Sequence, residues 1–139
     1  MTDSQLDTAA ATAATAAPRI LIVDDERRNR ELLEVMLSTE GYLLETATCG
    51  DEALRMVARQ PPDLILLDIM MPGMDGYQVA ARIKGNVATK HILIIMLTAL
   101  DDRNSKMHGL SAGAEEFLTK PVNRAELCSR VRDLLRLPS

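Results

Sequence analysis

Four of the five short apolar runs in this sequence are followed directly by a side chain that could take part in chemistry. Carboxylates follow the first and third runs, a hydroxyl follows the fourth, and an ammonium follows the fifth. These residues are Asp24, Asp25 and Glu26, then Asp68, Thr98 and Lys120. A carboxylate can ligate a metal or attack an electrophile, whereas a hydroxyl and an ammonium can hold an anionic group. The set favours a metal site or phosphoryl chemistry.

The aspartates predict a site for a hard divalent cation. Three carboxylates at one place repel one another unless a proton or a cation relieves the repulsion. Mg²⁺ takes about six oxygen ligands and keeps several waters, so two or three carboxylates and one backbone carbonyl suffice. The carbonyl of Met70, two residues beyond Asp68, is well placed to be that ligand. We expect Mg²⁺, or Mn²⁺ in its place, on these oxygens.

Lys120 and Thr98 point to phosphoryl transfer as the reaction. Neither residue has a task in simple metal storage, but both side chains bind phosphoryl oxygens. Phosphoryl transfer needs an in-line nucleophile, a metal and a fixed cation, and asks little else of the protein. Asp68 as the nucleophile completes this set.

The apolar runs themselves predict β-strands, because they are short and rich in β-branched residues. They lie at 20–23, 42–47, 64–67, 92–97 and 117–119. With the second strand starting near Leu43, the strand starts are 21 to 28 residues apart, which fits a strand followed by a crossover helix. The third and fourth runs are apolar throughout, as expected for parallel strands that are covered on both faces.

Apolar residues recur at helical spacing between the strands and after the last one. These sets are Leu32, Leu33, Met36 and Leu37; Ala53, Leu54 and Val57; Val79 and Ile83; Met107 and Leu110; and Leu127, Val131, Leu134 and Leu135. Five strand–helix units cannot close an eight-stranded barrel, and they share no repeated motif. We therefore expect an α/β fold, an open doubly wound (βα)5 parallel sheet that binds ligands at the carboxyl ends of its strands.

Four motifs in this order resemble the receiver domain of bacterial two-component response regulators, the CheY-like family. They are IVDDE, LLDIMMPGMDG, the pair TA at 98–99, and GAEEFLTKP, and the resemblance spans roughly Arg19 to Leu137. It implies a flavodoxin-like strand order of 2-1-3-4-5 and a receiver domain over residues 19–137.

The resemblance also implies a role for each residue of the set. Asp68 would be the phosphoacceptor, Asp24, Asp25 and the Met70 carbonyl would join it in binding the metal, and Thr98 and Lys120 would contact the phosphoryl group. Phe117 would be the switch aromatic together with Thr98, and Lys120–Pro121 would be a cis peptide bond. The chain would catalyse only its own phosphorylation and dephosphorylation, and would not be an enzyme in any other sense.

Partners follow from the same resemblance. A sensor histidine kinase or a phosphotransfer protein would supply the phosphoryl group, and an unidentified effector would read the switch. A homodimer could form through the fourth helix, fifth strand and fifth helix, where Leu110, Phe117 and Leu127 lie. Alternatively, the chain is the receiver of a longer regulator with a cyclic-dinucleotide enzyme, because MMPGMDGYQ and TALDDR resemble receivers of that kind.

The length, charge and composition of the chain limit these expectations. The chain of 139 residues is long enough for one domain, and its formal charge of −4 argues against a whole-surface grip on nucleic acid or anionic lipid. Residues 1–18 are rich in Ala and Thr and predict a flexible tail. Without a run long enough to span a bilayer or a signal peptide, we expect a cytoplasmic protein. Cys49 and Cys128 read as packing or surface thiols.

Other functions of the same fold class fit less well. A flavodoxin-type carrier needs a phosphate-binding first loop, which Asp24 and Asp25 would oppose. No GxxxxGK[ST] follows any strand, which argues against a P-loop hydrolase. A haloacid-type phosphatase would need DxDx[TV] after the first strand, whereas the carboxylates here are adjacent.

Overall fold

A computed structural model of the chain describes residues 17–99 and 112–136. Its elements in chain order are β1 (Arg19–Val23), α2 (Arg27–Leu37), β2 (Leu43–Ala47), α3 (Gly50–Arg59), β3 (Leu64–Asp68), α4 (Gly76–Lys84), β4 (Leu93–Thr98), β5 (Glu116–Thr119) and α6 (Arg124–Arg136). The predicted tail, except for its last two residues, and the helix expected around Met107 and Leu110 lie outside the described residues.

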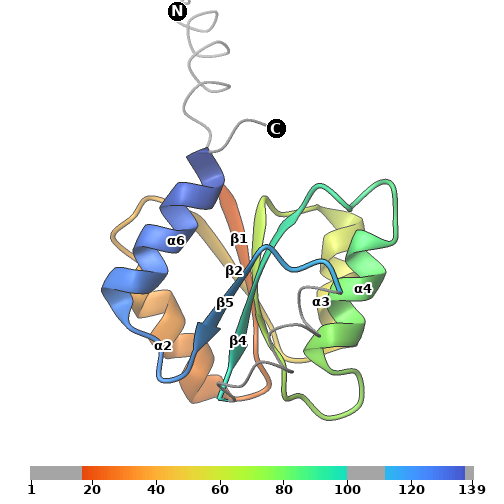
Figure 1. The fold of residues 1–139 in the computed structure, drawn as a ribbon, viewed down its shortest axis with the longest axis horizontal. Coiled ribbons are helices and arrows are strands. Elements are labelled where there is room, and N and C mark those ends of the chain that lie inside the picture. Colours follow the sequence, from red (N-terminus) through yellow and green to blue (C-terminus); the bar gives the residue numbers. More distant parts are fainter. Residues whose placement is uncertain (1–16, 100–111, 137–139) are drawn as a thin grey trace, which may run out of the picture.

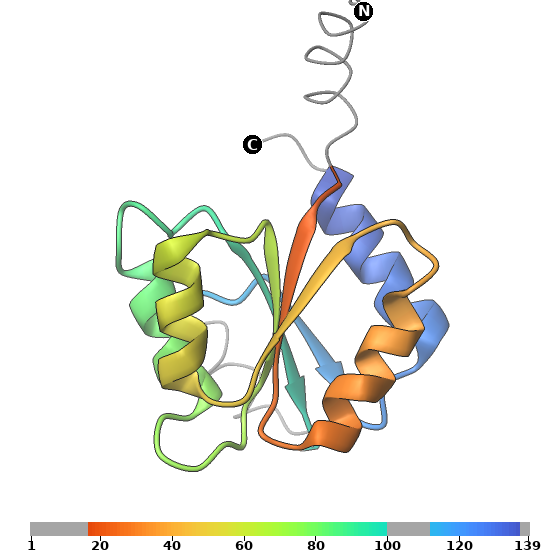
Figure 2. The same ribbon diagram turned by 180° about the vertical axis from the view of Figure 1, so that it is seen from behind.

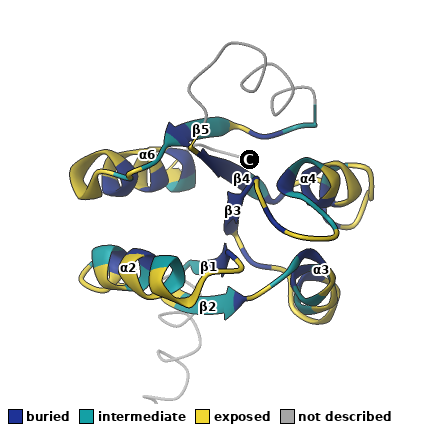
Figure 3. Cartoon of the chain, turned by 90° about the horizontal axis from the view of Figure 1, so that it is seen from below, coloured by how far each residue is buried: buried dark blue, intermediate teal, exposed yellow. Residues whose placement is uncertain are grey.

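The five strands form one parallel sheet in the order β2-β1-β3-β4-β5. One face is covered by α2 and α6 and the other by α3 and α4, so the domain has three layers (Figures 1 and 2). Figure 3 shows these layers along the strands. The doubly wound α/β sheet and its predicted strand order are confirmed. The carboxyl ends of the strands meet at one edge, called here the rim, which carries Asp24, Asp25, Asp68, Thr98 and Lys120.

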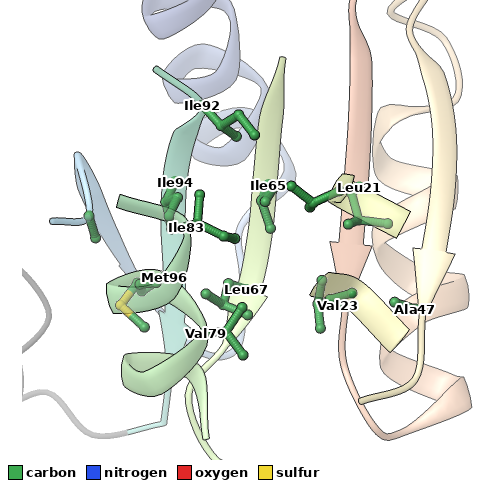
Figure 4. Packing of buried hydrophobic residues seen from close by; sticks show 14 of the residues in the cluster. Leu21, Val23, Ala47, Ile65, Leu67, Val79, Ile83, Ile92, Ile94 and Met96 are labelled. Atoms are coloured by element: carbon green, nitrogen blue, oxygen red, sulfur yellow. The ribbon is translucent and has the colours of Figure 1, made fainter. Parts of the chain in front are cut away.

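Two apolar clusters hold the layers together, one on each face of the sheet. Alternate residues of a strand enter opposite clusters: Leu21 and Val23 face α3 and α4, whereas Ile20 and Ile22 face α2 and α6. Figure 4 shows the first cluster from close by. Each fully buried aliphatic side chain contributes about 1.5–3 kcal/mol relative to exposure. The apolar runs therefore mark strands whose two faces are both stabilised by helices.

The helix α2 differs in one position from its predicted core face. Leu33 and Leu37 are buried, but Leu32 is 53% exposed. Successive residues in a helix are separated by about 100°, so the stripe that faces the sheet through Leu33 and Leu37 turns Leu32 to the side. Leu32 therefore leaves an apolar side chain exposed on the surface beside the rim.

The start of α4 is fixed by a reciprocal pair of hydrogen bonds. The Asp75 carboxylate accepts from the backbone N–H of Gln78, and the Gln78 side chain accepts from the N–H of Asp75, each at 2.9 Å. This capping box satisfies amide groups that the first turn would otherwise leave unpaired. It places Gly76, the first residue of α4, next to the end of β3. None of the helices in the described ranges is long and apolar enough to cross a membrane.

Candidate functional site

Three aspartates come together at the rim, as the sequence predicts. One carboxylate oxygen from each of Asp24, Asp25 and Asp68 can be chosen so that all lie within 4.8 Å of one another. Asp24 is fully buried, Asp68 is 4% exposed, and Asp25 faces solvent. Parallel pairing of β1 with β3 aligns the two strand ends that carry these residues. The fold therefore concentrates negative charge at one partly buried position.

The loop after β1 holds Asp24 from three directions. Its N–H donates to the carbonyl of Ala47 at 3.2 Å, and one carboxylate oxygen accepts from the N–H of Glu26 at 2.9 Å. The guanidinium of Arg30, one turn along α2, donates to the Asp24 carbonyl at 2.9 Å. Both the backbone and the carboxylate are thus oriented before any ligand arrives.

Lys120 is the cation of the site. Its ammonium donates to the Asp68 carboxylate at 2.8 Å and lies 3.4 Å from that of Asp24. The backbone N–H of Lys120 donates to the carbonyl of Thr98 at 2.7 Å, which ties the ends of β4 and β5 together. One ammonium therefore faces a cluster of three aspartates.

The pKa directions reflect this charge imbalance. Burial raises the pKa of the Asp68 carboxyl, and although the hydrogen bond from Lys120 opposes this, the charges of Asp24 and Asp25 add to the rise. Burial disfavours the Lys120 ammonium, but its hydrogen bond and attraction to Asp68, together with Asp24, outweigh burial and leave its pKa raised. The site is therefore short of positive charge.

The residues present fit a hard divalent cation. A hollow of about 190 Å³ opens at the rim and is lined by Asp25, Glu26, Asp68, Met70, Ala99 and Lys120. Its donors are carboxylate oxygens, which suit Mg²⁺ or Mn²⁺ rather than a soft metal. Met70 is 64% exposed and is among the residues that line the hollow. A cation here would offset the burial and the neighbouring negative charges that raise the pKa of Asp68.

The remaining predicted site residues lie on β4 and β5. Thr98 is fully buried at the end of β4 and is aligned with Thr119 of β5. Phe117 is half-buried and packs against the cluster beneath α3 and α4. The Lys120–Pro121 peptide bond is cis. Of the TALDDR segment, only Thr98 and Ala99 are among the described residues.

Sequence reasoning missed residues of α2 and α4 that contact the site. Arg30 was not singled out because a lone arginine on a helix carries no motif, yet it holds the Asp24 carbonyl. Leu32 was noted only for its helical spacing, whereas it lines a second hollow, of about 370 Å³, whose lining also includes Asp24 and Lys120.

Comparison with known proteins agrees with this arrangement. A model of the response regulator receiver domain matches residues 20–132, which is most of the chain. The chain belongs to the response regulator receiver family. The domain bounds of 19–137 stay a prediction.

This receiver domain is similar to curated response regulators and to solved receiver structures. It is 50% identical over 118 residues to the response regulator PleD of Caulobacter vibrioides, a match that covers 85% of the chain and 26% of PleD. It is 46% identical over 118 residues to the response regulator MprA of Mycobacterium leprae, which covers 85% of the chain and 51% of MprA. The chain thus spans about a quarter of one relative and about half of the other.

Two solved structures show the same fold. The chemotaxis protein CheY4 of Vibrio cholerae superposes with a TM-score of 0.80 at 31% identity, covering 84% of this chain and 98% of that one. The receiver domain of a signal transduction histidine kinase from Syntrophus aciditrophicus gives a TM-score of 0.80 at 38% identity, covering 88% and 96%. Receiver domains thus occur both in separate regulators and in kinases among these relatives.

Proposed function

We propose that this receiver domain accepts a phosphoryl group on Asp68 in a reaction that requires Mg²⁺ or Mn²⁺. The observation that carries the proposal is the Asp68 carboxylate, buried at the rim beside Asp24 and Asp25 and 2.8 Å from the Lys120 ammonium. A nucleophile, hard oxygen ligands and a fixed cation are the parts that phosphoryl transfer requires. No other cluster of three metal-ligating side chains occurs among the described residues.

The chemistry proceeds by exchange of one bond for another at phosphorus. A carboxylate oxygen of Asp68 bonds to the phosphorus of a phosphohistidine or an acyl phosphate, and the bond from phosphorus to the donor atom breaks with its electron pair. Lys120, and Thr98 at the neighbouring strand end, would bind the oxygens of the transferred group. A bound Mg²⁺ would supply positive charge against the phosphoryl oxygens. Water later cleaves the phosphorus–oxygen bond and restores the Asp68 carboxylate.

The phosphodonor partner would be a histidine kinase or a phosphotransfer protein that docks beside the rim on α2. Leu32 and Val35 are 53% and 67% exposed and lie three residues apart, so they form an apolar stripe on the helix. The stripe borders the 370 Å³ hollow whose lining includes Asp24 and Lys120. A partner helix that covers this stripe would place its phosphohistidine near Asp68.

The output of the switch is a separate proposal. Thr98 and Phe117 would change position on phosphorylation and so control an effector that docks on the β5 side. For a homodimer through that side, Leu127 is excluded as a contact because it is fully buried, and Leu110 lies outside the described residues. A cytoplasmic location and the absence of any further enzymatic activity in this domain stay predictions.

A second candidate concerns the whole protein. The chain would be the receiver of a longer regulator that controls a cyclic-dinucleotide enzyme. Two observations favour it: the MMPGMDGYQ and TALDDR segments resemble receivers of that kind, and the match to PleD covers only 26% of that regulator. Reading the gene on both sides of the region that encodes this chain tests this candidate, because an adjoining reading frame without a cyclic-dinucleotide enzyme would contradict it.

The experiment that tests Asp68 is labelling with a small phosphodonor. The chain is incubated with Mg²⁺ and acetyl phosphate, and acid-stable, hydroxylamine-sensitive phosphate is measured. We expect labelling of the wild type and its loss in Asp68→Asn. Asp75→Asn is the control, because asparagine caps α4 as well as aspartate does and labelling should continue. Equal labelling of Asp68→Asn and wild type would overturn the assignment.

A further inference from the structure

Gly76 lies in close contact with the backbone of the proposed phosphoacceptor. It is buried, it opens α4, and its N–H donates to the carbonyl of Ile69 at 2.9 Å. A Cβ atom built on Gly76 would lie 2.5 Å from the carbonyl oxygen of Asp68 and 2.8 Å from the Cα of Ile69. Both atoms belong to the backbone, so no side-chain rotation could relieve the overlap. A side chain at this position must displace either α4 or the chain after β3.

The segment that Gly76 touches carries two of the proposed metal ligands. Asp68 supplies its carboxylate, and Met70, two residues later, supplies its backbone carbonyl. On the other side of this segment, the N–H of Ile69 donates to the carbonyl of Leu97 at 3.1 Å. Residues 68–70 are therefore held between the end of β4 and the first turn of α4. A shift of α4 would act on the positions of both ligands together.

We propose that Gly76 is a positioning residue that sets Asp68 and the Met70 carbonyl against Asp24 and Asp25. The inference rests on the proposed function, since it concerns the same site. Glycine permits contact between α4 and the Asp68 backbone, whereas alanine would push residues 68–70 away from their place. A displacement of about 1 Å at a reacting group lowers a rate by about a hundredfold. The site therefore requires glycine at residue 76.

The chain contains a matched control in Gly50. This glycine is also buried and also opens a helix, α3, and it lies near α4. A Cβ atom on Gly50 would lie 2.9 Å from Cγ2 of Val79 and 3.0 Å from Cβ of Met74, both of which are side-chain atoms. Alanine at residue 50 therefore crowds the side chains of Val79 in α4 and of Met74 in the preceding loop, with no atom of residues 68–70 among its nearest contacts.

The test compares Gly76→Ala with Gly50→Ala by two measurements on the folded chain. Isothermal titration gives the dissociation constant for Mg²⁺, and acetyl phosphate labelling gives the rate of phosphorylation. For Gly76→Ala we expect the Mg²⁺ dissociation constant to rise at least tenfold and labelling to slow by about a hundredfold. For Gly50→Ala we expect both values within about twofold of wild type, with a lower melting temperature. Equal effects of the two variants would overturn the proposal.

A second variant covers the case in which Gly76→Ala does not fold. Asp75→Ala removes the capping box and loosens the first turn of α4 without adding atoms, and Asp75→Asn retains the cap. A several-fold weaker Mg²⁺ affinity in Asp75→Ala alone supports the proposal, and unchanged affinity overturns it. The proposed function is contradicted by a different result, namely equal labelling of wild type and Asp68→Asn. In that case the Mg²⁺ titrations still test whether Gly76 positions the metal ligands.

Discussion

The two ends of the sheet each hold a partly buried lysine, and the two lysines have opposite surroundings. At the rim, Lys120 faces a cluster of three aspartates. At the opposite edge, the ammonium of Lys84 donates to the Glu115 carboxylate at 2.7 Å and to the carbonyls of Ile92 and Lys90 at 2.6 and 3.1 Å. The second oxygen of Glu115 accepts from the N–H of Ile94 at 2.7 Å.

The difference separates an ion pair with balanced charges from one beside excess negative charge. Lys84 and Glu115 balance each other in charge, and their hydrogen bonds fix the starts of β4 and β5. Lys120 leaves negative charge uncompensated, and the raised pKa of Asp68, caused by burial with help from its acidic neighbours, is the sign of this. A buried charge that is not paired raises the energy of the fold. The excess of negative charge at the rim supports the proposed binding of a divalent cation there.

The largest expected effect comes from adding Mg²⁺. At a free concentration of about one hundred times its dissociation constant, it should raise the free energy of unfolding by about 2.7 kcal/mol. Chemical denaturation with and without Mg²⁺ measures this. Lys84→Met should show the same increase, because its site lies at the other edge, and Asp25→Asn should show much less. A similar loss in both variants would show that the two ends are not independent.

Removal of the structural ammonium comes next in size. Lys84→Met should lower the free energy of unfolding by about 2 kcal/mol, because Glu115 and the carbonyl of Ile92 lose a charged donor in a partly buried position. Lys90→Met, at an exposed neighbouring lysine, should change it by less than about 0.5 kcal/mol. Urea unfolding compares the two. If Lys84→Met also weakened Mg²⁺ binding, the separation of the two ends would be wrong.

The smallest effect has the opposite sign and depends on pH. Without a divalent cation, Asp68→Asn should raise the free energy of unfolding by about 1 kcal/mol at neutral pH, because it removes a charge that burial disfavours. The pKa of Asp68 is raised in the folded state. Its protonated form therefore stabilises the fold at low pH, and this contribution is lost as the pH rises through the folded pKa. The advantage of asparagine should vanish below about pH 4, and a destabilised variant at neutral pH would contradict the charge imbalance.

The features that the sequence predicts well are those that depend on residue type along a single strand. The runs at 64–67 and 92–97 fall in β3 and β4, because strands covered on both faces are apolar throughout. Asp24, Asp25 and Asp68 meet because parallel strands bring their carboxyl ends to one edge. Once the strands were found, the order of the motifs along the chain was sufficient to place these three carboxylates together.

The features that cannot be predicted from the sequence depend on contacts between helices and strands. Lys84 meets Glu115, which lies 31 residues later, only because α4 packs across the start of β4. The contact of Gly76 with the Asp68 carbonyl depends on where α4 begins relative to β3, which no local pattern specifies. Leu32 is as apolar as a core residue, but it lies one position before Leu33 on the helix and therefore points away from the sheet. Such contacts are set by the packing of the whole domain.

The direction in which the chain enters and leaves the domain has a practical consequence. The start of β1 and the end of α6 lie at the edge of the sheet opposite the rim (Figure 1). An affinity tag or a fluorophore attached on that side stands away from Asp68 and from the apolar stripe on α2. When the domain is immobilised there on a sensor surface, its rim faces the solution. Binding of a phosphodonor protein can then be measured without obstruction.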